Sequence, residues 1–102
     1  MSYKKLVLKS TAAIEIEEII TYYFGINKNI AKKLEREIRI CFKKISKNPE
    51  GFQFRHKTIR VIWLNKFPYG IYYLFDTNEV YILAFWSSKE DFPTKINKIF
   101  PS

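Results

Sequence analysis

The order of apolar and polar positions predicts two helices in the first half of the chain. The first begins near Ser10 or Thr11, because either side chain can cap a helix start. Gly25 suits the position just past a helix end, so we expect the helix to stop there. Its apolar residues recur at spacings of three and four along one stripe: Ile16, Ile19, Ile20, Tyr23 and Phe24.

The second helix is predicted to start near Asn27 or Asn29. It should end at Asn48, because Pro49 follows and the residue before a proline avoids the helical region. The link between the two helices is short, so we expect them to pack as an antiparallel hairpin. A stripe that steps by three and four marks the buried face: Ala31, Leu34, Ile38, Cys41 and Ile45.

Runs rich in β-branched and aromatic residues predict strands before and after this hairpin. Four strands are expected, over residues 3–9, 58–64, 69–75 and 80–86. The last three form an antiparallel meander. Residues 50–57 read as a loop and residues 94–100 as a short final helix. The predicted fold class is therefore α+β in the order β-α-α-β-β-β, with a helical hairpin packed on a small, mostly antiparallel sheet in a single domain, residues 1–102.

Composition narrows the class of protein. A chain of 102 residues, 47% of them hydrophobic, can bury a core without a metal or a disulfide. Cys41 is the only cysteine, so no internal disulfide can form, which fits a reducing compartment. No apolar run reaches the roughly 20 residues of a membrane span, and the apolar stretch at residues 6–8 is short for a secretory signal. We expect a cytoplasmic protein with no membrane partner.

The charge is uneven along the chain. There are 18 Lys and Arg against 10 Asp and Glu, which gives a net charge of +8. The second helix carries much of this excess, and Arg36 and Lys43 are candidate contact residues on it. Three explanations stay open for its basic face: a solvated surface, a site for an acidic partner segment, or a site for phosphates whose binding falls steeply with salt. Lys33 with Glu37 and Glu35 with Arg39 are expected to pair locally.

Common enzyme motifs are missing from the sequence. It contains no glycine-rich phosphate loop, paired-cysteine metal site or nucleophile elbow, so we expect no metal and no cofactor. Cys41 lies on the buried helix stripe, where core packing is the expected role. His56 stands between Arg55 and Lys57. It is either an ordinary loop residue or a proton carrier.

Residues 59–73 resemble the RelE/ParE superfamily of small bacterial toxins. The strongest part is residues 66–73 (Lys-Phe-Pro-Tyr-Gly-Ile-Tyr-Tyr), preceded by residues 59–61 (Ile-Arg-Val). Other parts follow in the family's order: residues 15–23 resemble its first helix, 45–50 the end of its second, and 80–85 its last core strand. The resemblance implies the same element order and a type II toxin–antitoxin pair. Its toxins are neutralised by an antitoxin whose C-terminal segment wraps them, and they cleave mRNA on the ribosome or poison DNA gyrase.

The resemblance also suggests site residues. An mRNA endonuclease would use Arg60, Lys66 and Lys89 to stabilise the charge on the phosphate, with His56 or a tyrosine moving protons. After the last strand the family often has a His followed by Arg residues, whereas this chain has Ser87, Ser88 and Lys89. Lys89 keeps a charge but lacks the bidentate fork of Arg. This departure favours a gyrase inhibitor, which needs no cleavage chemistry.

Further residues are candidates for binding a partner or nucleic acid: Arg55, Lys57, Arg36, Lys43 and Trp86. Trp86 and Phe92 are expected to be exposed near the C-terminus as part of an antitoxin groove. A homodimer and a hetero-oligomer with the antitoxin both stay open. Two alternatives to an active toxin remain: a catalytically decayed toxin-fold module that binds an antitoxin or RNA, and a plain structural domain.

Overall fold

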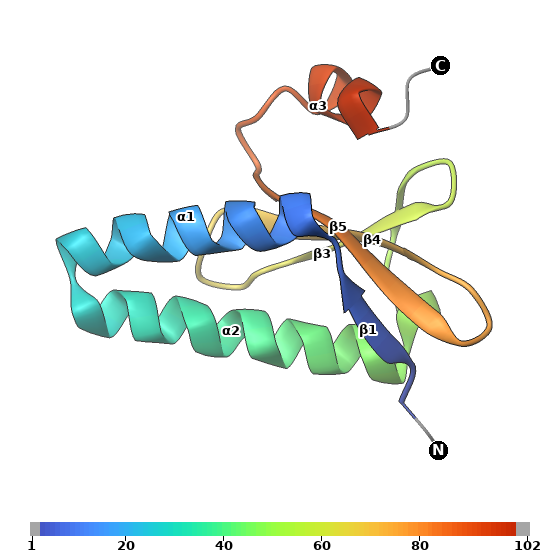
Figure 1. Ribbon diagram of the computed structural model, residues 1–102, viewed down its shortest axis with the longest axis horizontal. Helices are drawn as coiled ribbons and strands as arrows, with labels where there is room; N and C mark the ends of the chain where they lie inside the picture. Colours follow the sequence, from blue (N-terminus) through green and yellow to red (C-terminus); the bar gives the residue numbers. More distant parts are fainter. Residues whose placement is uncertain (1–2, 100–102) are drawn as a thin grey trace.

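The computed structural model of the protein describes residues 3–99 and has the α+β class and the element order that the sequence predicts, with two short elements added (Figure 1). The helices are α1 (Ser10–Ile26), α2 (Lys28–Lys47) and α3 (Phe92–Ile99), with a 3₁₀ turn η1 (Pro49–Gly51). The strands are β1 (Lys5–Leu8), β2 (Phe54–His56), β3 (Ile59–Trp63), β4 (Tyr69–Phe75) and β5 (Glu79–Ser87). Phe100, the last residue of the predicted final helix, lies outside the described residues.

The five strands form one sheet in the order β1-β5-β4-β3-β2. Strands β2 to β5 pair antiparallel as the meander predicts, and β1 pairs parallel to β5. The parallel pair needs a crossover, which α1 and α2 supply. The long strand β5 therefore lies between β1 and β4, and β3 lies next to the short edge strand β2.

Each face of the sheet is covered by helix (Figure 1). The α1–α2 hairpin packs on one face through a core that includes Leu34, Ile38, Ile71 and Phe85. All five residues of the predicted α2 stripe are buried. On the opposite face α3 covers a second cluster, in which Ile96 packs with other apolar side chains of the sheet. Both layers rest on the alternation of side chains along the strands.

The link between α1 and α2 is the single residue Asn27. Its side-chain oxygen accepts hydrogen bonds from the backbone N–H groups of Asn29 and Ile30, at 2.9 and 3.3 Å, so it caps the start of α2. Its own N–H donates to the carbonyl oxygen of Tyr23 and closes α1. The expected stop at Gly25 was wrong, because Asn27 serves both helix ends and α1 continues through Ile26.

The expected loop at residues 50–57 contains structure that the sequence did not reveal. The turn η1 follows α2 directly, and β2 then pairs with β3 at Phe54 with Arg60 and at His56 with Ile59. A register shift separates these two pairs. A strand of three residues is too short to show an alternating pattern, so only the tertiary pairing defines it.

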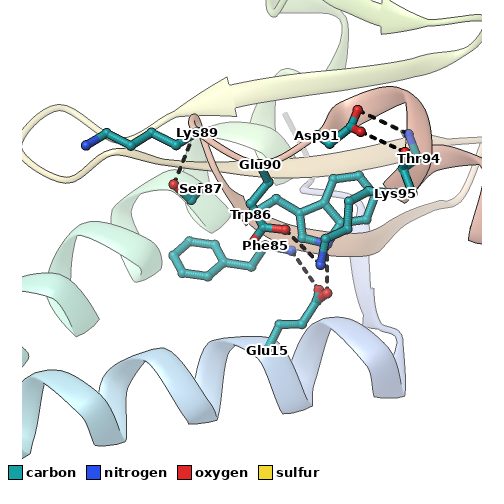
Figure 2. Close-up of polar contacts among 9 residues, drawn as sticks. All are labelled: Glu15, Phe85, Trp86, Ser87, Lys89, Glu90, Asp91, Thr94 and Lys95. Carbon is teal, nitrogen blue, oxygen red and sulfur yellow. Dashed lines mark hydrogen bonds and ion pairs between the residues drawn. The ribbon is translucent and has the colours of Figure 1, made fainter.

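The first turns of α1 close the edge of β5 beyond the end of β1 (Figure 2). The Thr11 hydroxyl donates to the carbonyl oxygen of Leu83 at 3.3 Å. The Glu15 carboxylate accepts from the Phe85 backbone N–H at 3.1 Å and from the Trp86 indole N–H at 2.7 Å. Side chains from α1 thus satisfy polar groups of β5 beyond the part of that strand that pairs with β1.

Candidate functional site

A groove of about 600 Å³ runs between α2 and the outer edge of β3. Apolar side chains, Ile40, Phe52 and Val61 among them, are part of its lining. The remaining lining residues include four cations, Lys33, Arg36, Lys44 and Lys66, and the amides Gln53 and Asn65. We call this feature the α2–β3 groove. Its chemistry suits an extended segment that carries both apolar and acidic side chains.

The strand edge that borders the groove is only partly paired. Strand β2 pairs with the start of β3, and the Val61 N–H donates to the Gln53 carbonyl oxygen at 3.1 Å. In the sheet as described, no strand lies beside Ile62 or Trp63 on this outer side. Such an edge can pair with an extended segment of another chain. The opposite edge is different, because α1 covers β5 beyond β1.

The cations of α2 are not neutralised within their own helix. Across residues 3–99 one ion pair is present, Lys95 with Glu90 at 2.7 Å. The expected local pairs of Lys33 with Glu37 and Glu35 with Arg39 therefore do not form. Glu37 instead accepts a hydrogen bond from the Lys66 backbone N–H at 2.9 Å and so holds the β3–β4 loop against α2.

The two contact residues predicted on α2 are both exposed. Arg36 lines the α2–β3 groove. Lys43 is exposed on the same helix but does not line the groove. The basic surface of α2 thus extends from the groove onto the solvent-facing side of the helix, and both regions attract acidic groups.

Arg60 holds the segment after α2 against the sheet. Its guanidinium donates to the carbonyl oxygens of Phe52 at 2.6 Å and Glu50 at 3.2 Å. The same group stacks on the Phe54 ring, with its central carbon 3.8 Å from the ring centre. These contacts lie on the face of the sheet that the helical hairpin covers. They give Arg60 a structural role, since its donors are engaged by backbone oxygens.

Arg55 and His56 contact the start of α3. The Arg55 guanidinium lies 3.9 Å from the centre of the Phe92 ring, and the His56 ring lies 6.1 Å from it. Lys57, exposed at the β2–β3 turn, has a φ of 51°, a left-handed backbone conformation. Arg55 and His56 therefore meet α3 on the face opposite to the Arg60 contacts, so the structure does not gather these three residues.

Lys66 and Lys89 lie in two loops at one end of the sheet. The loops are joined by a hydrogen bond from the Ser88 N–H to the Pro68 carbonyl oxygen at 2.8 Å. Both lysines are exposed. The Lys89 backbone N–H donates to the Ser87 hydroxyl, and its side chain extends away from the Glu15 and Asp91 contacts (Figure 2). Lys66 and Lys89 therefore share an end of the sheet, remote along the strands from the β2–β3 turn that carries His56.

The expected exposure of Trp86 was wrong, since its side chain is only 4% exposed. Its ring packs against Tyr72 and Phe92, with centroid distances of 4.9 and 6.2 Å. Phe92 is itself half-buried. The reason is α3, which folds back over this face and which the sequence places only loosely. The structure exposes Trp63 instead, at 38%.

Two tyrosines near these residues keep their protons at neutral pH. Burial raises the pKa of Tyr73 to about 12, and the Tyr73 hydroxyl donates to the Pro49 carbonyl oxygen at 2.7 Å. Burial also raises the pKa of Tyr72, while the neighbouring Arg55 offsets part of the rise. Neither hydroxyl is suited to act as a base near pH 7.

Burial raises the pKa of the Cys41 thiol to about 11. The thiol therefore stays neutral and is a poor nucleophile at physiological pH. Residues 3–99 contain no group of three or more His, Cys, Asp or Glu side chains placed to hold a metal ion. None of the described helices has the length and apolar character needed to span a bilayer.

The α2–β3 groove was not predicted from the sequence. The sequence predicts Lys66 and Arg36 as separate candidates and does not predict Phe52, Gln53 or Trp63 as site residues. The basic face of α2 was the available signal. The other wall depends on where β2 stops pairing with β3, which is a tertiary feature.

Comparisons with known proteins identify a matching family and a structure with the same fold. Over residues 6–92 the sequence matches the family described as ParE toxin of type II toxin-antitoxin system, parDE. Among the solved structures that match is a chain of the chromosomal ParDE toxin–antitoxin system from P. aeruginosa, with a TM-score of 0.72 and 19% identity. The alignment covers 83% of this chain and 96% of that chain. At this identity the likeness shows the fold. No curated protein sequence matches.

Proposed function

Because this chain belongs to the ParE toxin family of type II toxin–antitoxin systems, we propose that it slows growth when its antitoxin is absent. The family match over residues 6–92 carries this proposal, and it agrees with the resemblance seen in residues 59–73. The chain acts in the cytoplasm, where both candidate targets, DNA gyrase and the ribosome, are found.

Induced expression in a bacterial host tests the toxin proposal. Growth should stop soon after induction of the chain alone and should continue when the adjacent reading frame is expressed with it. Gly70→Arg serves as a control that disrupts the fold, because any side chain at Gly70 meets the Trp63 ring. Normal growth with the intact chain alone, at a protein level confirmed by immunoblot, would contradict the proposal.

The α2–β3 groove supports the proposal of an antitoxin partner. An extended acidic segment of the antitoxin would pair with the free edge of β3 and place its carboxylates near Lys33, Lys44 and Lys66. The net charge of +8 favours the approach of such a segment. Its apolar side chains would cover the apolar part of the groove lining.

Charge reversal in the groove tests this mode of binding. Lys33→Glu and Lys44→Glu should each weaken binding of the adjacent gene's product by about tenfold or more in calorimetry at physiological salt. Lys5→Glu is the matched control, since Lys5 is exposed on β1 at the other edge of the sheet. Equal affinity for all four proteins would rule out the groove as the antitoxin site.

The placement of the candidate site residues supports DNA gyrase, rather than ribosome-bound mRNA, as the target of the chain. RNA cleavage needs a base and an acid close to the same phosphate. Arg60 is engaged by backbone oxygens, and His56 lies near α3 rather than beside Lys66 or Lys89. These placements support an inhibitor that works by binding. Toeprinting of ribosomes with the purified chain tests the alternative, and new cleavage at ribosome-bound codons would favour the endonuclease.

A further inference from the structure

The exposed surface of the helical hairpin carries apolar residues on both helices, and on α2 it extends to the rim of the α2–β3 groove. Ile14 and Tyr22 on α1 are 55% and 64% exposed, and Ile40 on α2 is 45% exposed. The acids Glu17 and Glu18 line a shallow depression on α1 together with Ile14 and Tyr22. On α2 the exposed neighbours are basic. One hairpin thus presents an acidic–apolar helix beside a basic–apolar helix.

The single-residue link fixes how these residues line up. Because α1 ends at Ile26 and α2 starts at Lys28, residues equally far before and after Asn27 lie at about the same height along the antiparallel pair. Ile14 is thus level with Ile40, which is also exposed and apolar. By the same count Glu18 is level with Arg36, and Tyr22 with Lys32.

We propose that this face joins two copies of the chain. A twofold axis parallel to the helices places α1 of one copy over α2 of the other, and α2 over α1 in return. Ile14 then meets Ile40 of the second copy, and Glu18 meets Arg36. Tyr22 lies against Lys32, where the ammonium can sit over the ring. Each contact occurs twice, so the surface is self-complementary.

The size and charge of the face fit this partner. Helices of 17 and 20 residues offer a surface about 25 Å long and about 20 Å wide, about 500 Å² in all, which is below the roughly 800 Å² per partner of a standard interface and fits a weak, concentration-dependent dimer. Two copies of charge +8 repel each other at long range, but physiological salt screens this beyond about 8 Å. The contacts proposed here are shorter and of opposite sign. Arg36 and Ile40 also line the α2–β3 groove, so the dimer and a segment bound in that groove compete for these two side chains.

Sedimentation equilibrium of the purified full chain, from low to high micromolar concentration at physiological salt, tests the proposal. The chain should reach twice its monomer mass. Glu18→Arg and Arg36→Glu should each weaken the dimer about tenfold or more, and the double variant should restore it because both pairs re-form with exchanged signs. Glu50→Arg is the control for net charge, since Glu50 is exposed outside this face.

Three results would overturn the proposal. The first is a monomer over the whole concentration range. The second is a dimer that Glu18→Arg weakens no more than Glu50→Arg does, since both raise the net charge equally. The third is a double variant as weak as the single variants. Circular dichroism confirms that each variant is folded, and all the substituted residues are exposed, so loss of folding is not expected.

Discussion

Gly25 and Gly70 have opposite surroundings, although both lie inside regular elements. A Cβ built on Gly25, which is in α1, meets nothing within 4 Å apart from its chain neighbours and the backbone of its own helix. Glycine costs a helix about 0.5–1 kcal/mol relative to alanine. We expect Gly25→Ala to raise the free energy of unfolding by about that amount, as measured by urea denaturation.

At Gly70 the same change should destabilise the protein. A Cβ there lies 2.8 Å from the Trp63 ring and 2.9 Å from a Val61 methyl group. Ring and methyl are side chains of the neighbouring strand, so accommodating the new atom strains packed groups. We expect Gly70→Ala to lower the free energy of unfolding by about 1–3 kcal/mol. A gain in stability at Gly70, measured in the same urea series, would contradict the close packing of Trp63 over β4.

Tyr73 should make the protein less stable in alkali. Its pKa is raised from 10.0 to about 12 by burial, so the unfolded chain releases this proton first as pH rises. The contribution of Tyr73 to the free energy of unfolding is therefore fully present below pH 10 and is lost as the pH rises towards 12. Tyr73→Phe should lose about 1 kcal/mol at pH 7 with the hydrogen bond to Pro49, and its stability should fall less steeply above pH 10. Urea unfolding at several pH values measures the free energy of unfolding of the intact protein and of Tyr73→Phe. If the two free energies fall equally steeply above pH 10, Tyr73 does not have this role.

At the scale of residues, local spacing predicted burial well and specific contacts poorly. The stripe on α2 needs only helical periodicity, and every member is buried. Trp86 could not be placed from sequence, because its burial depends on α3 folding back over the sheet. The charge of Arg60 makes it a candidate site residue in the sequence, whereas its partners in the structure are the backbone oxygens of Glu50 in η1 and of Phe52, the residue after η1.

At the scale of elements, α1 does more than pack its apolar stripe. Glu15 accepts hydrogen bonds from two buried donors of β5. Glu15→Ala should leave both without an acceptor and lower the free energy of unfolding by about 1–3 kcal/mol. Glu17→Ala is the matched control, because Glu17 is exposed and its loss should change stability by less than about 0.5 kcal/mol. Thermal unfolding compares the two, and equal melting temperatures would contradict the edge-capping role.

The predicted elements agree with the structure where their patterns are long. α2 carries about five helical turns of consistent periodicity and was placed to within a residue at its end. The end of α1 was missed because Asn27 alone turns the chain, and a glycine nearby gave a stronger local signal. Strand β2 and turn η1 were missed because each has three residues and forms only against its neighbours.

At the scale of the whole molecule, charge and topology divide the protein into distinct surfaces. The sheet has one edge closed by β1 and α1 and another only partly closed by β2, and the basic helix α2 lies along the open one. The sequence predicted the order of elements and the basic helix. It could not predict that the two meet in the α2–β3 groove, because that requires the pairing of the meander.

Inhibition of DNA supercoiling is the most direct test of the central claim, that this ParE-family chain acts by binding gyrase. Purified chain is added to gyrase, ATP and relaxed plasmid, with and without the antitoxin. We predict that the chain blocks supercoiling in proportion to its concentration and that the antitoxin restores it. Full supercoiling at a large excess of folded chain, together with cleavage of ribosome-bound mRNA by the same preparation, would contradict the account.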